Sequence, residues 1–295
     1  MNTNRTRLTA WIVMLLPSTL SLILWRELAG GEPAWWYLIP LAGLLMILAG
    51  TYLSDSLRGL RGYTALMLLL FLMGFGGGWT FGVIPWIRVK PQWSNLLSSL
   101  PAGFSDLAVH LLRLSPALII LATFLLRGKS LRDLYLTRGD IYAAVKPTRL
   151  LGVKDKISWL NMALRFSAVF GLGTLIFLFL SARPDLGQIW SNLGVLPFAV
   201  IIAGLNAFNE EFTLRAAPIS MLGALSEKDA LALTTVFFAL GHYYGVPYGL
   251  IGVLLSGFLG WFIGKGILET RGFLLAWFTH LVPDIVIFGF LLVYG

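Results

Sequence analysis

The chain has 295 residues, of which 57% are hydrophobic and 12% charged, and its mean hydropathy is +0.81. A soluble domain does not need so much apolar surface, whereas repeated apolar runs of about 20 residues span a bilayer as helices. The absence of cysteine excludes disulfides, cysteine-ligated zinc and thiol nucleophiles, and the net charge of +8 indicates cytosolic loops facing anionic lipid rather than nucleic acid.

The composition therefore predicts an all-α fold, a polytopic bundle of transmembrane helices. Nine apolar segments follow one another, and because the seventh is short, eight or nine membrane spans are expected. In chain order they cover residues 9–25, 34–53, 64–86, 107–126, 159–182, 193–215, 229–243, 248–266 and 272–293.

One basic loop separates the fourth segment from the fifth. Residues 127–158 hold eight of the 22 lysines and arginines and three of the 14 acidic residues. The positive-inside rule places this loop in the cytosol, and counting spans back places the N-terminus there too. Because the loops are short and no soluble domain is seen, we expect a prokaryotic plasma membrane.

Two adjacent carboxylates stand at the end of the sixth segment. Glu210 and Glu211 follow an apolar run, and Arg215 comes one turn later. Ionised side chains in hydrocarbon cost at least about 2.5 kcal/mol each at a helix centre. Glu211 and Arg215 share a helix face and can pair, whereas Glu210, rotated by about 100°, is left for chemistry. A structural ion pair near the lipid headgroups is the alternative.

The remaining ionisable candidates lie in the last segments. His242 ends the seventh segment, and His280 and Asp284 lie four residues apart in the ninth. Intramembrane ionisable residues normally face one another or a wet cavity, so we expect these groups to gather in one site. His110 is interpreted as structural or interfacial, and Arg113 as an arginine that reaches toward the headgroups.

Such a site has three possible chemistries. A carboxylate beside a histidine can take a proton from water, which then attacks an amide carbonyl, while a second histidine stabilises the oxyanion. The same groups could bind zinc through Glu210, His242 and His280, although no His-Glu-x-x-His spacing is present. A proton-coupled transporter would also use buried Glu, His and Asp.

Three spacings carry a family resemblance: Glu210-Glu211-x-x-x-Arg215, Phe238-x-x-x-His242 and His280-x-x-x-Asp284. Together they resemble the motifs of the CPBP family, the CAAX protease and bacteriocin-processing proteins, which include the type II CAAX prenyl endopeptidases. The resemblance covers residues 193–293. It implies N-terminal membrane segments at 1–192 and a catalytic core at 193–295.

The resemblance further implies an intramembrane endopeptidase of glutamate type, open to the cytosol. Its substrate would be a membrane-associated or lipidated protein. Glu210 would activate the water and Glu211 would be oriented or neutralised by Arg215. A non-catalytic membrane module of bacteriocin-immunity or scaffold type is the alternative function, next to the transporter.

For the other motif residues the resemblance implies supporting roles. His242 would position or activate the water, with Phe238 packed near it, and His280 would contribute to the oxyanion site. The prenyl proteases usually have Asn where this chain has Asp284. An ionised Asp cannot donate a hydrogen bond to an oxyanion, so Asp284 is either protonated or an acceptor that orients His280.

Overall fold

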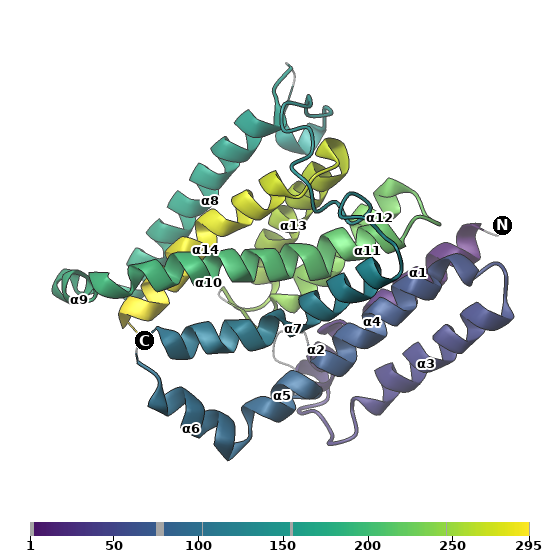
Figure 1. The fold of residues 1–295 in the computed structure, drawn as a ribbon, viewed down its shortest axis with the longest axis horizontal. Coiled ribbons are helices and arrows are strands. Elements are labelled where there is room, and N and C mark those ends of the chain that lie inside the picture. Colours follow the sequence, from purple (N-terminus) through teal and green to yellow (C-terminus); the bar gives the residue numbers. More distant parts are fainter. Residues whose placement is uncertain (1–2, 75–79, 102, 154–155, 246, 295) are drawn as a thin grey trace. The chain divides into compact units, whose positions relative to one another are not determined.

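The computed structural model describes residues 3–74, 80–101, 103–153, 156–245 and 247–294. Within these ranges the fold is all-helical, with one isolated antiparallel bridge between Ala144 and Ser158 and no strand (Figure 1). The chain forms two compact units, and each is described by itself. The first comprises Met1–Lys90 and Thr213–Gly264, and the second comprises Pro91–Phe212 and Lys265–Gly295.

The helices of the first unit are α1 (Thr3–Leu15), α2 (Leu20–Ile23), η1 (Leu24–Leu28), α3 (Leu38–Leu53), η2 (Arg58–Leu60), α4 (Arg61–Met73), α5 (Val83–Arg88), α11 (Ala217–Met221), α12 (Glu227–Gly241) and most of α13 (Leu250–Thr270). Those of the second unit are α6 (Pro91–Ser99), α7 (Phe104–Leu126), η3 (Arg149–Leu151), α8 (Trp159–Ala182), α9 (Leu186–Ser191), η4 (Leu193–Val195), α10 (Leu196–Glu211) and α14 (Leu274–Tyr294).

Within the described ranges, five helices are long and apolar enough to cross a membrane: Phe104–Leu126, Trp159–Ala182, Leu193–Met221, Leu250–Thr270 and Leu274–Tyr294. A sixth is added if Asn4–Leu15 and Leu20–Leu28, which meet at a bend of 62°, form one span. The protein is therefore an integral membrane protein, but the expected eight or nine spans are not confirmed.

Helix length explains the difference. The expected spans at 34–53 and 229–243 fold as helices of 16 and 15 residues. At 1.5 Å per residue these reach about 24 and 22 Å, less than the roughly 30 Å of a hydrocarbon core. The expected span at 64–86 stops being helical at Met73, because Gly74 takes a left-handed conformation (φ 74°) and caps the helix.

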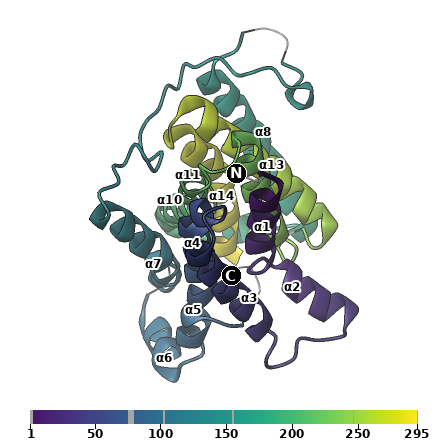
Figure 2. The same cartoon turned by 90° about the vertical axis from the view of Figure 1, so that its right-hand side faces the viewer.

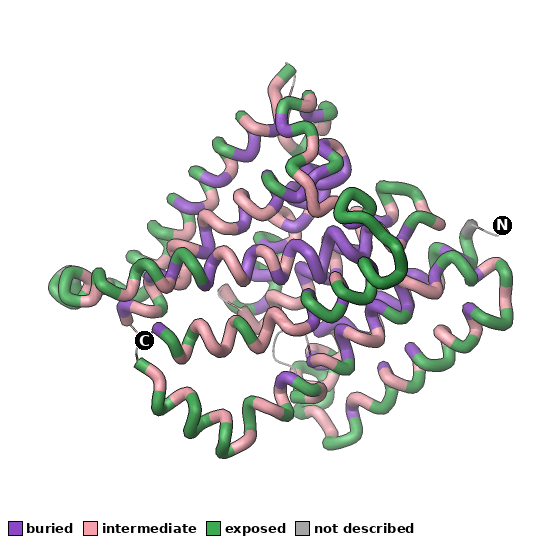
Figure 3. The backbone as a smooth tube through the Cα atoms, viewed as in Figure 1, coloured by how far each residue is buried: buried purple, intermediate pink, exposed green. Residues whose placement is uncertain are grey.

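The core of the second unit is built on α10. This helix packs against α14 and α7, and α14 packs in turn against α8 (Figure 1). Small residues allow close approach, because a Cβ on Gly171 of α8 would lie 2.9 Å from Val282. The indole of Trp277 donates to the carbonyl of Gly204 (3.0 Å) and ties α14 to α10. Buried positions concentrate on the facing sides of α10 and α14 (Figure 3).

The first unit joins helices distant in sequence. The helix α1 packs against α3, α4 and α12, and α4 also contacts α11 (Figure 2). Close approach again depends on glycine, because a Cβ on Gly62 of α4 would clash with Sδ of Met221. Arg7 of α1 and Asp229 of α12 form an ion pair at 2.8 Å.

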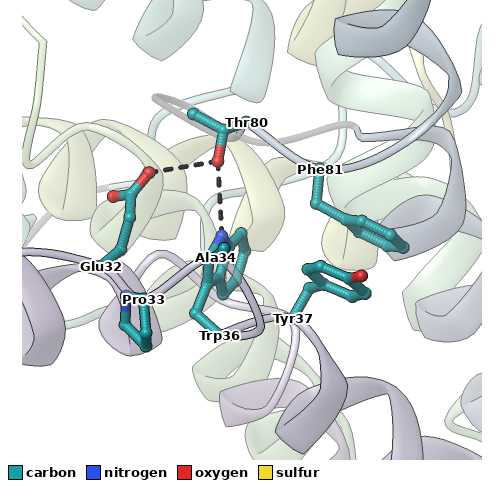
Figure 4. A pocket seen from close by; sticks show the side chains of 7 residues that line it. All are labelled: Glu32, Pro33, Ala34, Trp36, Tyr37, Thr80 and Phe81. Carbon is teal, nitrogen blue, oxygen red and sulfur yellow. Dashed lines mark hydrogen bonds between the residues drawn. The ribbon is translucent and has the colours of Figure 1, made fainter.

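A cavity of about 340 Å³ in the first unit is lined by Glu32, Pro33, Ala34, Trp36, Tyr37, Thr80 and Phe81 (Figure 4). The carboxylate of Glu32 accepts hydrogen bonds from Arg26 and from the Thr80 hydroxyl (3.1 Å). The hydrogen bond from Arg26 lowers the pKa of Glu32 below its usual value. Because the carboxylate of Glu32 is already paired with Arg26, we interpret the cavity as structural and not as a ligand site.

Candidate active site

The candidate site begins where α10 stops being a regular α-helix. Its α-helical turns end at Glu211, and the chain continues as the π-helical turn η5 (Phe212–Ala216) into α11. Pro218 gives the physical reason, because it has no N–H for the carbonyl of Leu214 and its ring pushes that carbonyl away. Turns of this kind inside helices are frequent at functional sites. The regular α-helix expected through Arg215 is therefore wrong at this turn.

Glu211 and His280 form a close polar contact in the core of the second unit. Nδ1 of His280 lies 2.5 Å from Oε1 of Glu211, and both residues are buried. The contact joins the end of α10 to the second turn of α14. A carboxylate at Nδ1 holds a proton on that nitrogen and fixes the plane of the ring. The position of the other ring nitrogen, Nε2, is thereby fixed as well.

Two further carboxylates face Nε2 of His280. Oε2 of Glu210 lies 3.8 Å away and Oδ1 of Asp284 lies 3.5 Å away. Both separations exceed an ordinary direct hydrogen bond. The amide of Asn206 donates to Oδ2 of Asp284 (2.9 Å). This bond favours the acceptor role for Asp284, one of the two roles left open by the sequence.

The sequence interpretation missed Arg113. Instead of reaching toward the headgroups, its guanidinium lies on Glu210, with Nη2 3.4 Å from Oε1. The side chain of Arg113 is 34% exposed and that of Glu210 is 13% exposed, so the pair borders the site rather than the lipid-like core. Glu210 therefore lies between an arginine and a histidine. This environment suits a carboxylate that acts as a general base.

Local features of α7 present this arginine. Pro116 removes the N–H that would bond the carbonyl of Leu112, and the Ser115 hydroxyl bonds that carbonyl instead (2.7 Å). One residue further on, the carbonyl of Arg113 accepts from the amide of Asn209 (2.9 Å) and fixes α7 on α10. The signal in the sequence was a polar stripe at helical spacing, Asn206, Asn209 and Glu210, inside an apolar helix.

The other motif residues lie in the first unit and contact one another. The guanidinium of Arg215 lies 3.8 Å from the ring centre of Phe238, whose ring centre is 4.3 Å from that of His242. Nε of Arg215 donates to the carbonyl of Gly260 (3.2 Å). A Cβ on Gly260 would lie 2.9 Å from Nη2 of Arg215, so a larger residue here would displace the guanidinium. Phe238 thus packs near His242 as expected, and Gly260 is a residue the sequence interpretation missed.

The structure thus brings the expected residues together in two groups. Glu210, Glu211, His280 and Asp284 meet in the second unit, whereas Arg215, Phe238 and His242 meet in the first. The pairing of Glu211 with Arg215 and the place of His242 beside Glu210 remain predictions.

A metal role for these residues was also considered from the sequence. Across the described ranges, no three or more His, Cys, Asp or Glu side chains are arranged to hold a metal ion. In the second unit Nδ1 of His280 is occupied by Glu211, and Asp284 is bonded to Asn206. These residues do not fit a metal centre as they stand, and we derive no step through one.

Comparison with protein families identifies the core. Residues 191–286 match the family model of the Rce1-like type II CAAX prenyl endopeptidases. The resemblance to CPBP proteins is thereby confirmed over these residues, which match a membrane protease family, that is, a family of hydrolases. No curated protein and no solved structure matches the chain.

The matched Rce1-like residues include all seven motif positions and end two residues after Asp284. They do not include α7, so Arg113 belongs to no motif of the match. This explains why the prediction from motifs missed Arg113, although its guanidinium lies on the carboxylate of the motif residue Glu210.

Proposed function

We propose that the protein is an intramembrane endopeptidase in which Glu210 activates a water molecule. The observation that supports this most directly is the geometry around His280, whose Nδ1 is held by Glu211 while Nε2 faces Glu210 at 3.8 Å. A water bound beside Nε2 and the carboxylate can give a proton to Glu210 as its oxygen attacks the peptide carbonyl. The same proton then passes to the leaving amine, so acid and base are restored at the end of the cycle.

His280 and Asp284 would act on the charge that develops during this attack. A protonated Nε2 can donate to the oxyanion, as the family resemblance implies. Asp284, bonded to Asn206, would orient the imidazole as an acceptor. His242, from the first unit, would help to position the water, with Phe238 packed on its ring.

Arg113 would hold the carboxylate of Glu210 in place. Its guanidinium contacts Oε1, which leaves Oε2 for the water. Arg113 is therefore a positioning residue and not one that touches the substrate.

The substrate would be a membrane-associated or lipidated protein cleaved near the cytosolic face. His280 lies six residues into α14, which places it about 9 Å from the helix end. That end adjoins the basic loop at 127–158, which the positive-inside rule assigns to the cytosol together with the N-terminus. Membrane segments before residue 193, a catalytic core after it and a prokaryotic plasma membrane complete the proposal.

The decisive experiment compares new protein termini in membranes of cells producing the wild type, Glu210→Gln or Glu227→Gln. Glu210→Gln keeps the shape of the side chain but removes the base, and Glu227 is an exposed glutamate that serves as the matched control. We expect new termini with the wild type and the control but not with Glu210→Gln, at equal protein levels. If all three show identical termini although candidate substrates are present, the non-catalytic module replaces the peptidase.

A further inference from the structure

The segment between α7 and α8, described at residues 127–153 and 156–158, folds as part of the second unit, and we call it the strap. In Figure 2 it is the long teal trace outside the helices. Its backbone bonds to the turn between α13 and α14, where Asp140 N–H donates to the carbonyl of Thr270 and Phe273 N–H donates to that of Thr137, both at 2.8 Å. Its own Leu134, Ile141 and Val145 are buried. The described part of the strap is thus packed on the unit and is not a free loop.

One carboxylate anchors the second half of the strap. Glu269, near the end of α13, accepts hydrogen bonds from the backbone N–H of Lys146 and from Nε1 of Trp159, both at 2.9 Å. Its other oxygen pairs with Lys265, one turn earlier on α13. Because Lys146 and Trp159 both bond to the side chain of Glu269, the two ends of the segment that joins them are held together.

The strap presents a group of exposed cations. Its exposed lysines and arginines within the described ranges are Arg127, Lys129, Arg132, Arg138, Lys146, Arg149 and Lys156. None of these seven forms an ion pair with any residue that the structure describes. This fixed group of unneutralised charges makes a strong local positive potential.

The two described acids of the strap are engaged in its own turns. Asp133 accepts from the N–H (2.8 Å) and the hydroxyl (2.9 Å) of Ser130, and the backbone hydrogen bond lowers its pKa. Asp140 accepts from the N–H of Tyr142 (3.1 Å). Both carboxylates stabilise the backbone and leave the cations free for an external partner.

The position of the strap selects that partner. It begins directly after α7 and ends where α8 starts, and both are among the helices long enough to span a membrane. The strap therefore lies at the level of the lipid headgroups. Leu131, Tyr142 and Leu150 stand exposed among the cations at 47%, 66% and 63%, as expected for side chains that enter the interface.

We propose that the strap binds the headgroups of anionic phospholipids in the membrane that α7 and α8 cross. Its cations supply the charge complementarity, its backbone bonds to the α13–α14 turn hold them in place, and its exposed apolar side chains contact the upper acyl chains. This proposal does not depend on peptidase activity.

The test is native mass spectrometry of the purified full chain titrated with phosphatidylglycerol or phosphatidylcholine. The strap variant is Arg132→Gln, Lys146→Gln and Arg149→Gln together, which changes exposed side chains only. The control variant is Arg58→Gln, Arg88→Gln and Arg183→Gln, which removes the same charge from exposed positions on separate elements. Equal unfolding midpoints of the two variants establish that both are folded.

We expect the wild type and the control to retain phosphatidylglycerol in preference to phosphatidylcholine. Each basic residue near an anionic surface strengthens association about fivefold, so the strap variant should lose at least about tenfold in phosphatidylglycerol association. Unchanged association of the strap variant overturns the proposal. Equal losses in both variants overturn it as well, because net charge alone would then account for lipid binding.

Discussion

At the scale of single residues, the most informative position is Asp284. In Asp284→Asn the amide oxygen can still accept from Asn206, and the NH₂ group then faces Nε2 of His280. We expect kcat to fall about tenfold at unchanged KM, because one acceptor contact to the imidazole is replaced by a donor that competes with the water. Steady-state kinetics on a cleaved substrate measures this. An equal or higher kcat would instead indicate that the wild-type Asp284 is protonated and donates to the oxyanion.

Arg113 supports a second prediction at this scale. Arg113→Gln removes the cation from Oε1 of Glu210, so kcat should fall about tenfold or more while KM stays within about twofold. Arg113→Lys should recover part of the loss, because it restores the charge without the planar fork.

The matched control for Arg113 is Arg165→Gln, which removes an exposed arginine from the membrane helix α8. Its kcat should equal that of the wild type. If Arg113→Lys lost as much activity as Arg113→Gln, or if Arg165→Gln showed an equal loss, a positioning role for Arg113 would be contradicted.

Residue-scale prediction from the sequence succeeded where burial leaves few choices. Glu211, His280 and Asp284 had to meet because ionised groups in an apolar bundle must find partners, and in the second unit they do. Arg113 was not predictable in this way. Its partner Glu210 lies 97 residues further along the chain, and a lone arginine near a helix end is equally compatible with a side chain that reaches the headgroups.

At the scale of secondary-structure elements, the ion pair of Glu269 and Lys265 carries a stability prediction. Their side chains are 8% and 7% exposed, so Glu269→Ala leaves a buried ammonium without its carboxylate. The free energy of unfolding should fall by about 3 kcal/mol, measured by chemical unfolding in micelles. Proteolysis within residues 146–153 should accelerate, because the N–H of Lys146 and the indole of Trp159 lose their acceptor.

A double variant separates the two effects. Lys265→Met added to Glu269→Ala removes the unpaired charge and should restore part of the unfolding free energy, while the strap stays sensitive to protease. If the double variant is as unstable as Glu269→Ala, the anchor of the strap and not the ion pair accounts for the loss.

The elements themselves were predictable to different degrees. The bounds of α8 were predicted to the residue, because Ser158 caps the helix by accepting from the N–H of Asn161 at a sharp polar-to-apolar boundary. The π-turn after Glu211 was not predicted, since the effect of Pro218 on a helix depends on whether tertiary contacts tolerate a widened turn. The expected span at 64–86 failed at Gly74, because hydropathy alone does not reveal a left-handed cap.

At the scale of the whole molecule, composition determined the class. A chain this apolar has to be a membrane protein, and five or six helices long enough to span confirm it. The exact number of crossings did not follow from composition. A hydropathy window sums apolar residues whether or not they form one straight helix. The segment at 34–53 shows this, since residues 34–37 form a turn and only Leu38–Leu53 is helical.

The topology gives a further prediction. Because the sequence contains no cysteine, each introduced cysteine is the only thiol that can be labelled. Single cysteines replacing Lys146 and Arg183 flank α8, whose 24 residues span the bilayer, so a membrane-impermeant thiol reagent should label them from opposite sides. Lys146→Cys should react only after the cytosolic face is opened. Labelling of both from one side would contradict the proposed orientation of the strap.

The same reagent tests the expected span at residues 34–53. Trp35→Cys and Asp55→Cys lie at the two ends of the α3 region, and both positions are exposed. The helix covers only about 24 Å, but a bilayer can thin locally, and exposed Trp35 is suited to the interface. We therefore expect opposite-side labelling, which adds a crossing to the five long helices. Same-side labelling would make α3 a re-entrant or interfacial helix and remove one of the eight or nine spans expected from the sequence.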